Sequence, residues 1–277
     1  MFEYAFMQRA FAVGLMLGVI MPCIGVTIVL KRLSMLGDAL SHTSLAGVAG
    51  GLLLGIDPVL GATVTCVCAA FGIEAIRKKM PQYAELSIAI MLSAGVGLAG
   101  VLSGFVQNAS GFNSFLFGSI VAIQPSELIL TACISGGVLL TFLLLYKELF
   151  YMALDEHAAR RAGVPTGVIN SIFTVLTAAT ISVSARTVGA LIVSSMLVVP
   201  VACGMQLGKS YRQTVLWSIF FAESSIIGGL TLAFYAGLKP GSTIVLLSVV
   251  WLLVLLLGKG AAAMLYHRPS AERSRTP

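Results

Sequence analysis

The residues best suited to chemistry are an aspartate and a histidine four positions apart in an otherwise apolar stretch. Asp38 and His42 lie in Met35-Leu-Gly-Asp-Ala-Leu-Ser-His42. On a helix, residues at i and i+4 share one face, about one turn apart. A carboxylate and an imidazole are ligands for Zn²⁺, Mn²⁺ or Fe²⁺. From spacing alone, two interpretations are equally favoured. The pair either lines a metal pathway or forms a buried hydrogen-bonded contact that holds helices together.

Other polar side chains are candidates for the same pathway. Two ligands do not complete a metal site, and Ser41 is the hydroxyl nearest in sequence to the pair. Glu223 is an acid within Phe220-Phe-Ala-Glu-Ser-Ser225. Ionisable side chains are costly inside a membrane and raise a functional question by default. Glu223 is expected either to face the pathway or to pair with a neighbouring helix.

The remaining acids in or near apolar stretches have local explanations. Glu85 and Glu127 lie near predicted helix starts, where negative charge is favourable. Glu74 precedes Arg77 by three residues, which predicts an ion pair at the end of a helix. These three acids therefore carry no functional prediction.

A polar break at residues 154–165 is a second candidate site. Its acids precede its arginines, an order that matches the helix dipole. Its glycine and proline are placed to end a helix. The residues concerned are Asp155, Glu156, Ala159, Arg160, Arg161, Gly163 and Pro165. The break predicts a short helix at about 153–163, which is either a capped linker or a docking helix for a cytoplasmic partner.

The elements that position these residues are predicted to be membrane-spanning helices. Of the 277 residues, 58% are hydrophobic and 10% are charged, whereas a soluble domain carries roughly 25% charged residues. Apolar stretches recur at about the 20-residue length that crosses a bilayer. We predict an all-α polytopic bundle of eight or nine spans in one domain, 1–266, with a polar, disordered tail at 267–277. The spans are 10–30, 35–56, 58–76, 85–106, 125–146, 165–184, 187–207, 213–237 and 241–259.

The basic residues predict an orientation for the nine-span reading. With the Lys31 loop in the cytoplasm, all but three of the 17 lysines and arginines lie inside. The exceptions are Arg9, Arg186 and Lys239. This bias satisfies the positive-inside rule. We therefore expect a multi-pass protein of the plasma or inner membrane, with its N-terminus outside and its C-terminus cytoplasmic.

Several function classes lack their motifs in this sequence. There is no His-Glu-x-x-His, no Gly-x-Ser-x-Gly and no phosphate-binding loop ending in Gly-Lys-Ser/Thr. We therefore predict no enzyme activity, no catalytic residues and no covalently bound cofactor. The net charge of +6 follows the membrane topology, so no nucleic-acid partner is expected. Energy for active transport would come from a separate ATPase or an ion gradient.

The sequence resembles the permease subunits of zinc, manganese and iron ABC importers, the ABC-3 family. Five blocks in the same order carry the resemblance, beginning with the segment around Asp38 and His42. The blocks are residues 24–49, 115–123, 155–163, 188–200 and 240–246. The break with Asp155, Ala159 and Gly163 is similar to the helix through which the family contacts its ATPase.

The resemblance implies a function and a set of partners. It implies a permease homodimer in the lipid bilayer, cytoplasmic ATP-binding subunits and an extracytoplasmic metal-binding protein. It also implies that Asp38 and His42 line the path of the transported ion. Zinc is the first expected cargo, because residues 38–47 resemble zinc-type members and manganese-type members often have proline where Ala46 stands. Manganese and iron remain possible cargoes, and a stand-alone secondary transporter or channel is the alternative function.

Overall fold

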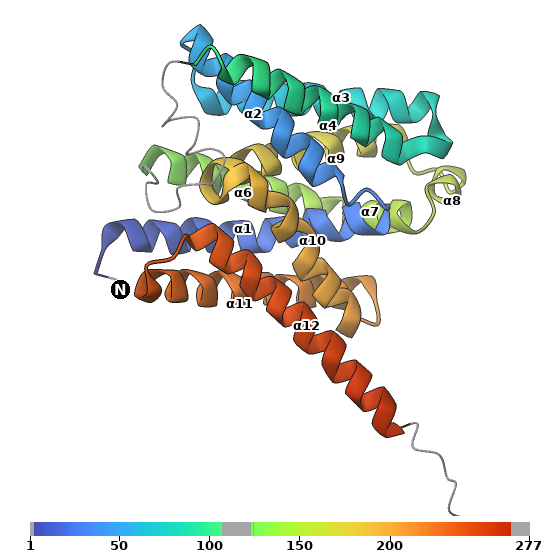
Figure 1. The fold of residues 1–277 in the computed structure, drawn as a ribbon. Coiled ribbons are helices and arrows are strands. Elements are labelled where there is room, and N and C mark those ends of the chain that lie inside the picture. The colour runs from blue at the N-terminus through green and yellow to red at the C-terminus, as the bar shows by residue number, and fades with distance from the viewer. Residues whose placement is uncertain (1–2, 107–122, 124, 267–277) are drawn as a thin grey trace, which may run out of the picture.

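The computed structural model of the chain describes residues 3–106, 123 and 125–266. Within those residues the regular structure is entirely helical, and most helices lie alongside one another (Figure 1). The long helices are α1 Ala5–Leu30, α2 Leu36–Leu54, α3 Pro58–Lys79, α4 Ala84–Ser103, α6 Pro125–Leu144, α9 Thr166–Ser184, α10 Ala190–Leu207, α11 Tyr211–Ala236 and α12 Pro240–Tyr266. The short elements described between them are η1 Pro81–Tyr83, α7 Tyr146–Leu154, α8 Glu156–Arg161 and the π-helical segment η3 Ala185–Gly189.

Local sequence sets several helix boundaries. Asp57 caps α3 by accepting hydrogen bonds from the backbone N–H groups of Val59 and Leu60, at 2.7 and 3.3 Å, which satisfies donors that the helix itself leaves unpaired. Gly55 and Gly237 end α2 and α11 with φ of 68° and 65°, a left-handed conformation that glycine adopts without steric cost. The connections between these helices are consequently short.

The helices have the character of membrane spans. In the described part of the chain, seven segments are long and apolar enough to cross a bilayer, by length and composition: Ala5–Leu30, Pro58–Lys79, Glu85–Ser103, Glu127–Leu144, Thr166–Gly189, Tyr211–Ala236 and Pro240–Lys259. In α10 the apolar stretch Ile192–Leu207 is shorter. The polar residues of α2, Asp38 and His42 among them, set that helix apart from the seven. The chain is therefore a polytopic membrane protein.

Each of the nine predicted spans overlaps one long helix, but several boundaries differ: α1 begins at Ala5 rather than 10, and α12 runs to Tyr266 rather than 259. The seventh span was expected to begin at residue 187, but α10 begins at Ala190 after the π-helical segment. Gly189, with φ of 105°, interrupts the helix there, and hydrophobicity alone carries no signal for such a break. The predicted tail at 267–277 and most of the block at 115–123 lie outside the described residues.

The helices form two groups joined by α10. On one side α2 packs against α3 and α4, and on the other α1 packs against α11 (Figure 1). α10 contacts α2 as well as α1, α11 and α12. The C-terminal half of α12 extends away from the rest of the bundle (Figure 1). Because α10 touches both groups, side chains on it can meet residues from distant parts of the sequence.

Candidate functional site

α2, which carries Asp38 and His42, is enclosed by other helices. It packs against α3, α4, α9 and α10. Glycines permit this close approach: a Cβ on Gly47 would lie 2.4 Å from the carbonyl oxygen of Gly61, and one on Gly95 would lie 2.6 Å from Thr43 Oγ1. Small residues let membrane helices pack at short range. The polar residues of α2 therefore lie within the bundle.

Asp38 contacts α10 directly. The hydroxyl of Ser194 donates a hydrogen bond to Asp38 Oδ1. The backbones are close here, since a Cβ on Gly37 would lie 3.3 Å from Ser194 Cα. Both side chains are only partly buried. The carboxylate is thus held from one side by a single neutral donor, and its other lone pairs remain available for a ligand.

His42 and Ser41 have few protein partners. His42 is partly buried, and no hydrogen bond links its imidazole to another described residue. Ser41 is 1% exposed, and its hydroxyl is buried without a partner among the described residues. A buried polar group left unpaired costs free energy. Ser41 and His42 therefore leave polar groups on this face of α2 that could bind a polar ligand.

The chemistry of this face suits a weakly held metal ion. It offers a carboxylate oxygen, an imidazole nitrogen and the hydroxyls of Ser41 and Ser194, and the first two are ligands for divalent transition metals. Among the described residues, no group of three or more His, Cys, Asp and Glu side chains is arranged to hold a metal ion. An ion at Asp38 and His42 would therefore complete its coordination with water, hydroxyl or carbonyl oxygens.

Glu223 lies at a different contact, between α11 and α1. A Cβ added to Gly18 would lie 2.7 Å from Glu223 Oε1, so the glycine makes room for the carboxylate. The side chain is partly buried. The described residues do not unite Glu223 with Asp38 and His42 in one cluster of ligands. Its predicted part in the pathway stays a prediction.

The predicted short helix is present as α8 and ends as its sequence indicates. Asp155 caps it by accepting hydrogen bonds from the backbone N–H groups of His157 and Ala158, at 2.8 and 3.0 Å. The bond from Ala158 is the main reason that the pKa of Asp155 lies below its usual value. Gly163 follows the helix with φ of 86°. Ala159 is buried, whereas Asp155 and Arg160 are exposed.

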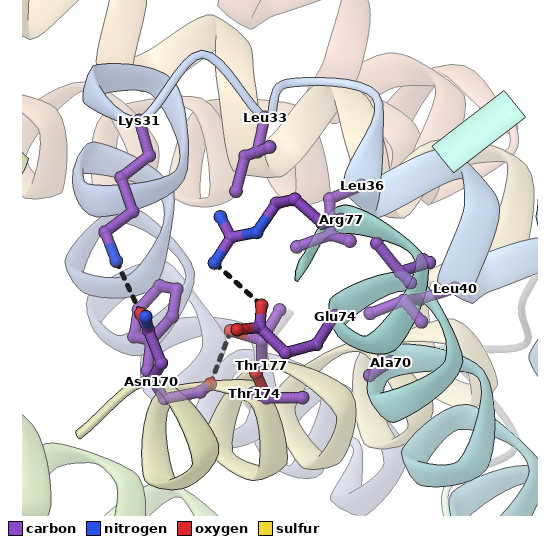
Figure 2. Close-up of a pocket in the computed structure, with 12 residues that line it drawn as sticks. Lys31, Leu33, Leu36, Leu40, Ala70, Glu74, Arg77, Asn170, Thr174 and Thr177 are labelled. Carbon is purple, nitrogen blue, oxygen red and sulfur yellow. Dashed lines mark hydrogen bonds and ion pairs between the residues drawn. The ribbon is translucent and has the colours of Figure 1, made fainter. Parts of the chain in front are cut away.

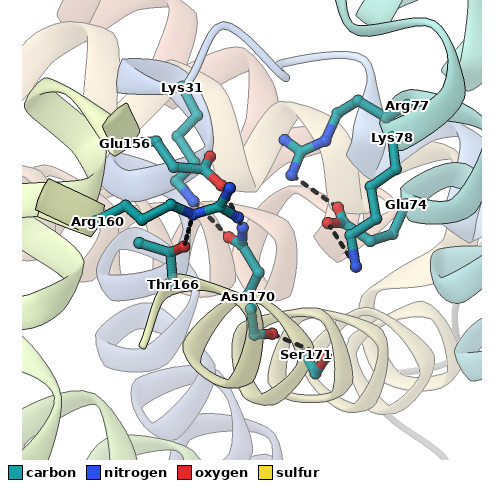
Figure 3. A network of polar contacts seen from close by, with 10 residues as sticks. Lys31, Glu74, Arg77, Lys78, Glu156, Arg160, Thr166, Asn170 and Ser171 are labelled. Atoms are coloured by element: carbon teal, nitrogen blue, oxygen red, sulfur yellow. Dashed lines mark hydrogen bonds and ion pairs between the residues drawn. The ribbon is translucent and has the colours of Figure 1, made fainter. Parts of the chain in front are cut away.

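A chain of polar contacts connects α8 with the ends of α9 and α1 (Figure 3). Asn170 donates from Nδ2 to Glu156 Oε1 at 2.8 Å and accepts from Lys31 Nζ at 2.8 Å. Arg160 Nε donates to Thr166 Oγ1 at 3.2 Å. We call Lys31, Asn170 and Glu156 the polar relay. It joins three elements through side chains that lie far apart in the sequence.

Lys31 is the most perturbed group of the polar relay. Burial lowers its pKa to about 8, and the nearby charge of Glu156 partly offsets this effect. The ammonium group also lies 5.7 Å from the centre of the Phe173 ring, within the range of a cation–π contact. The lysine is thus held by the Asn170 amide and the Phe173 ring, and among the described residues no carboxylate forms an ion pair with it.

A small cavity of about 30 Å³ lies beside the polar relay. Figure 2 shows Lys31 and Arg77 reaching toward Asn170 and Glu74 respectively. The predicted ion pair is present, with 2.7 Å between Arg77 Nη2 and Glu74 Oε2, and Lys78 Nζ lies 3.7 Å from Glu74 Oε1. The ends of α1, α3 and α9 therefore meet around paired charges.

One local explanation from the sequence was incomplete. Glu127 lies in the first turn of α6, as expected, but it also forms an ion pair with Arg186 of the π-helical segment. The two residues are 59 positions apart, so no short-range pattern identified the pair. The contact ties α6 to the connection between α9 and α10.

The chain is similar to known transport proteins over nearly its whole length. The profile of the ABC 3 transport family matches residues 3–259. A probable metal transport system membrane protein of Treponema pallidum is 34% identical over 258 residues, which cover 92% of this chain and 96% of the relative.

Two relatives at similar identity carry different metals in their names. The manganese transport system membrane protein MntC of Listeria monocytogenes is 31% identical, covering 90% of this chain and 89% of its own. The high-affinity zinc uptake system membrane protein ZnuB of Haemophilus influenzae is 30% identical, covering 90% and 95%. Identity to these relatives does not separate zinc from manganese.

A solved structure has the same fold. PsaBC from Streptococcus pneumoniae, determined in complex with a Fab, superposes with a TM-score of 0.82 at 27% identity, and the match covers 91% of each chain. The arrangement of helices described above is therefore that of an experimentally determined protein.

Proposed function

The chain belongs to the ABC 3 transport family, and from that premise we propose that it is the membrane-spanning subunit of an ATP-driven importer of divalent transition-metal ions. It is a permease, a transport component rather than a catalyst. In the proposed assembly, two copies of the permease form the pathway and separate cytoplasmic subunits hydrolyse ATP. An extracytoplasmic binding protein delivers the ion.

One observation supports the metal pathway most directly. Asp38 and His42 lie one turn apart on α2, inside a bundle of apolar helices, and only Ser194 is hydrogen-bonded to either side chain among the described residues. An ionised carboxylate and a neutral imidazole bind divalent metals. Because an importer must release its ion, few fixed protein ligands are an advantage here.

Zinc is the cargo that we propose to test first. The support is the chemistry of the Asp38 and His42 ligands together with the zinc-like block at residues 38–47. Manganese and iron are the alternatives, because the same ligands accept them and relatives carry manganese or zinc in their names. Affinity rises from Mn²⁺ to Zn²⁺ at such sites, so this pair by itself does not exclude zinc.

The polar relay is the proposed route from ATP hydrolysis to the pathway. α8 is the element that would contact the ATPase, and Glu156 on α8 holds Asn170 on α9. Asn170 in turn holds Lys31, at the end of α1 beside the turn that leads into α2. A movement of α8 would therefore reach the start of the helix that carries Asp38.

Cellular metal content tests the proposal. Cells with and without the permease are grown in media depleted of zinc, manganese or iron in turn, and each metal is quantified. We expect a loss of zinc that wild type restores and Asp38→Ala does not, with equal amounts of folded protein in the membrane. Glu85→Gln is the matched control, because it neutralises an exposed acid at the start of α4.

The other outcomes have distinct meanings. A loss of manganese or iron alone would replace zinc as the cargo and keep the pathway. Full uptake by Asp38→Ala would reject the assignment of α2. Uptake that persists when the ATP-binding subunit is absent would favour a stand-alone transporter.

A further inference from the structure

A groove outside the proposed pathway lies between α6, α7 and α11. Its volume is about 710 Å³. α6 and α11 both pack on α1, and Cys23 of α1 is part of the lining. The walls are mainly apolar, with Phe142 and Leu143 on α6 and Leu216 and Ile219 on α11. This shape and lining suit an acyl chain.

The polar end of the groove lies where the spans end. α6 stops at Leu144, and the amphipathic helix α7 begins at Tyr146. Lys147 and Arg212 are exposed at this end of the groove, and Arg212 lies in the first turn of α11. Basic side chains at the ends of spans attract the phosphate groups of lipids. The groove therefore runs from hydrocarbon depth to headgroup level.

Glu148 adds a feature that a phosphate alone does not explain. It lines the same polar end of the groove, and its Oε2 atom is buried without a hydrogen-bond partner in the described part of the chain. A buried carboxylate oxygen needs a donor, and charged donors are the most favourable. The polar end thus combines two cations with one unsatisfied acceptor.

We propose that this groove binds a phospholipid whose headgroup carries both a phosphate and a primary ammonium group, as phosphatidylethanolamine does. The phosphate lies between Lys147 and Arg212, the ammonium donates to Glu148, and an acyl chain lies against Phe142 and Leu216. This site is independent of the metal proposed as cargo.

The chemistry distinguishes this lipid from two common relatives. Phosphatidylglycerol offers the same phosphate to Arg212 but has no ammonium group, so Glu148 stays unpaired. Phosphatidylcholine has a positive charge but no N–H on its quaternary nitrogen, so it cannot donate a hydrogen bond to the carboxylate. A site built from Lys147, Glu148 and Arg212 should therefore prefer the ethanolamine headgroup over both.

Native mass spectrometry and thermal unfolding of the full-length protein in its purified native assembly test the proposal. Palmitoyl-oleoyl lipids with ethanolamine, glycerol or choline headgroups are added at equal concentrations. We expect the ethanolamine lipid to bind most tightly and to raise the melting temperature most. Glu148→Gln should weaken its binding about tenfold, the size of one charge-assisted hydrogen bond, and leave binding of the glycerol lipid unchanged. Arg212→Gln should weaken both lipids.

Two control variants separate this site from general surface charge. Glu85→Gln removes an acid on α4 and Lys209→Gln removes a base near Arg212, and neither residue lines the groove. Both should bind lipid as wild type does. Equal binding of all three lipids, an ethanolamine preference that survives Glu148→Gln, or no retained lipid in the groove would each overturn the proposal.

Discussion

The face of α2 around Asp38 and His42 and the polar relay differ in how far their polar side chains are already hydrogen-bonded. Around Asp38 and His42, the bond from Ser194 is the only side-chain hydrogen bond to either residue among those described, and the buried hydroxyl of Ser41 has no hydrogen-bond partner among them. Around Asn170, both ends of the amide are engaged at 2.8 Å. The polar atoms near Asp38 and His42 are therefore mostly free to bind a ligand, whereas those of Asn170 are already hydrogen-bonded within the protein.

This difference follows from what each region is proposed to do. A transport site binds an ion and then releases it, so protein contacts that occupied its ligands would compete with the cargo. A connection that passes motion must be stiff, and satisfied buried polar contacts provide rigidity. The two regions are connected through Lys31, which follows the end of α1 and lies seven positions before Asp38 in the first turn of α2.

The largest expected effect comes from removing ligands on α2. His42→Ala should reduce metal uptake by at least about 100-fold, and Ser194→Ala by about tenfold, because Ser194 orients the carboxylate of Asp38 without replacing it. Uptake of radioactive metal into cells or proteoliposomes measures both. Glu85→Gln should transport normally. If Ser194→Ala were as inactive as His42→Ala, Ser194 would belong among the ligands themselves.

A smaller and different effect is expected from the polar relay. Asn170→Leu leaves Lys31 and Glu156 without their shared partner, so transport should fall about tenfold while metal binding is retained. ATP hydrolysis should continue without matching uptake, and the ratio of the two rates measures this uncoupling. Ser171→Ala is the control, because Ser171 is adjacent on the same helix and only partly buried. Loss of metal binding in Asn170→Leu would contradict the proposal that the polar relay passes motion without taking part in ion binding.

The smallest expected effect is a pH dependence of stability from Lys31. Its pKa in the folded protein is about 8, below the ordinary value of 10.5. Between these values the unfolded chain binds more protons, so the Lys31 contribution to stability should rise with pH above about 8 and be least favourable below it. We expect a gain of about 1 kcal/mol at pH 9, relative to pH 7.

Comparison with a variant isolates this contribution from other titrating groups. Lys31→Met replaces the lysine with an unbranched side chain of similar length that does not titrate. The difference in unfolding free energy between wild type and Lys31→Met should move in favour of wild type as pH rises from 7 to 9. A difference that stays constant over this range would show that burial does not lower the pKa of Lys31 in the folded protein.

Local signals predicted the long helices and some of their ends. The cap at Asp155, the stop at Gly163 and the ion pair of Glu74 with Arg77 each depend on residues within a few positions. Such contacts form wherever the backbone is helical, so spacing is enough to predict them. The start of α10 was misplaced because the break at Gly189 depends on its φ of 105°, which no hydrophobic pattern encodes.

Contacts between distant segments escaped prediction. Ser194 lies 156 positions from Asp38, and Asn170 lies 139 positions from Lys31. Ser194 falls within a block that resembles the family, at residues 188–200, but nothing in that block indicates which hydroxyl meets the carboxylate. Asn170 had no signal beyond being an amide near the start of an apolar span.

The sequence alone determined the class of the protein, its helices and the pair of metal-ligand types on α2, because hydrophobic length and the i, i+4 spacing act within single helices. Only the tertiary structure decided what surrounds that pair, that Glu223 packs at Gly18 away from it, and that Lys31 reaches α8 through Asn170. The physical reason is that helix formation is local, whereas these partners meet through the packing of α1, α9, α10 and α11, which small residues and long-range contacts set together.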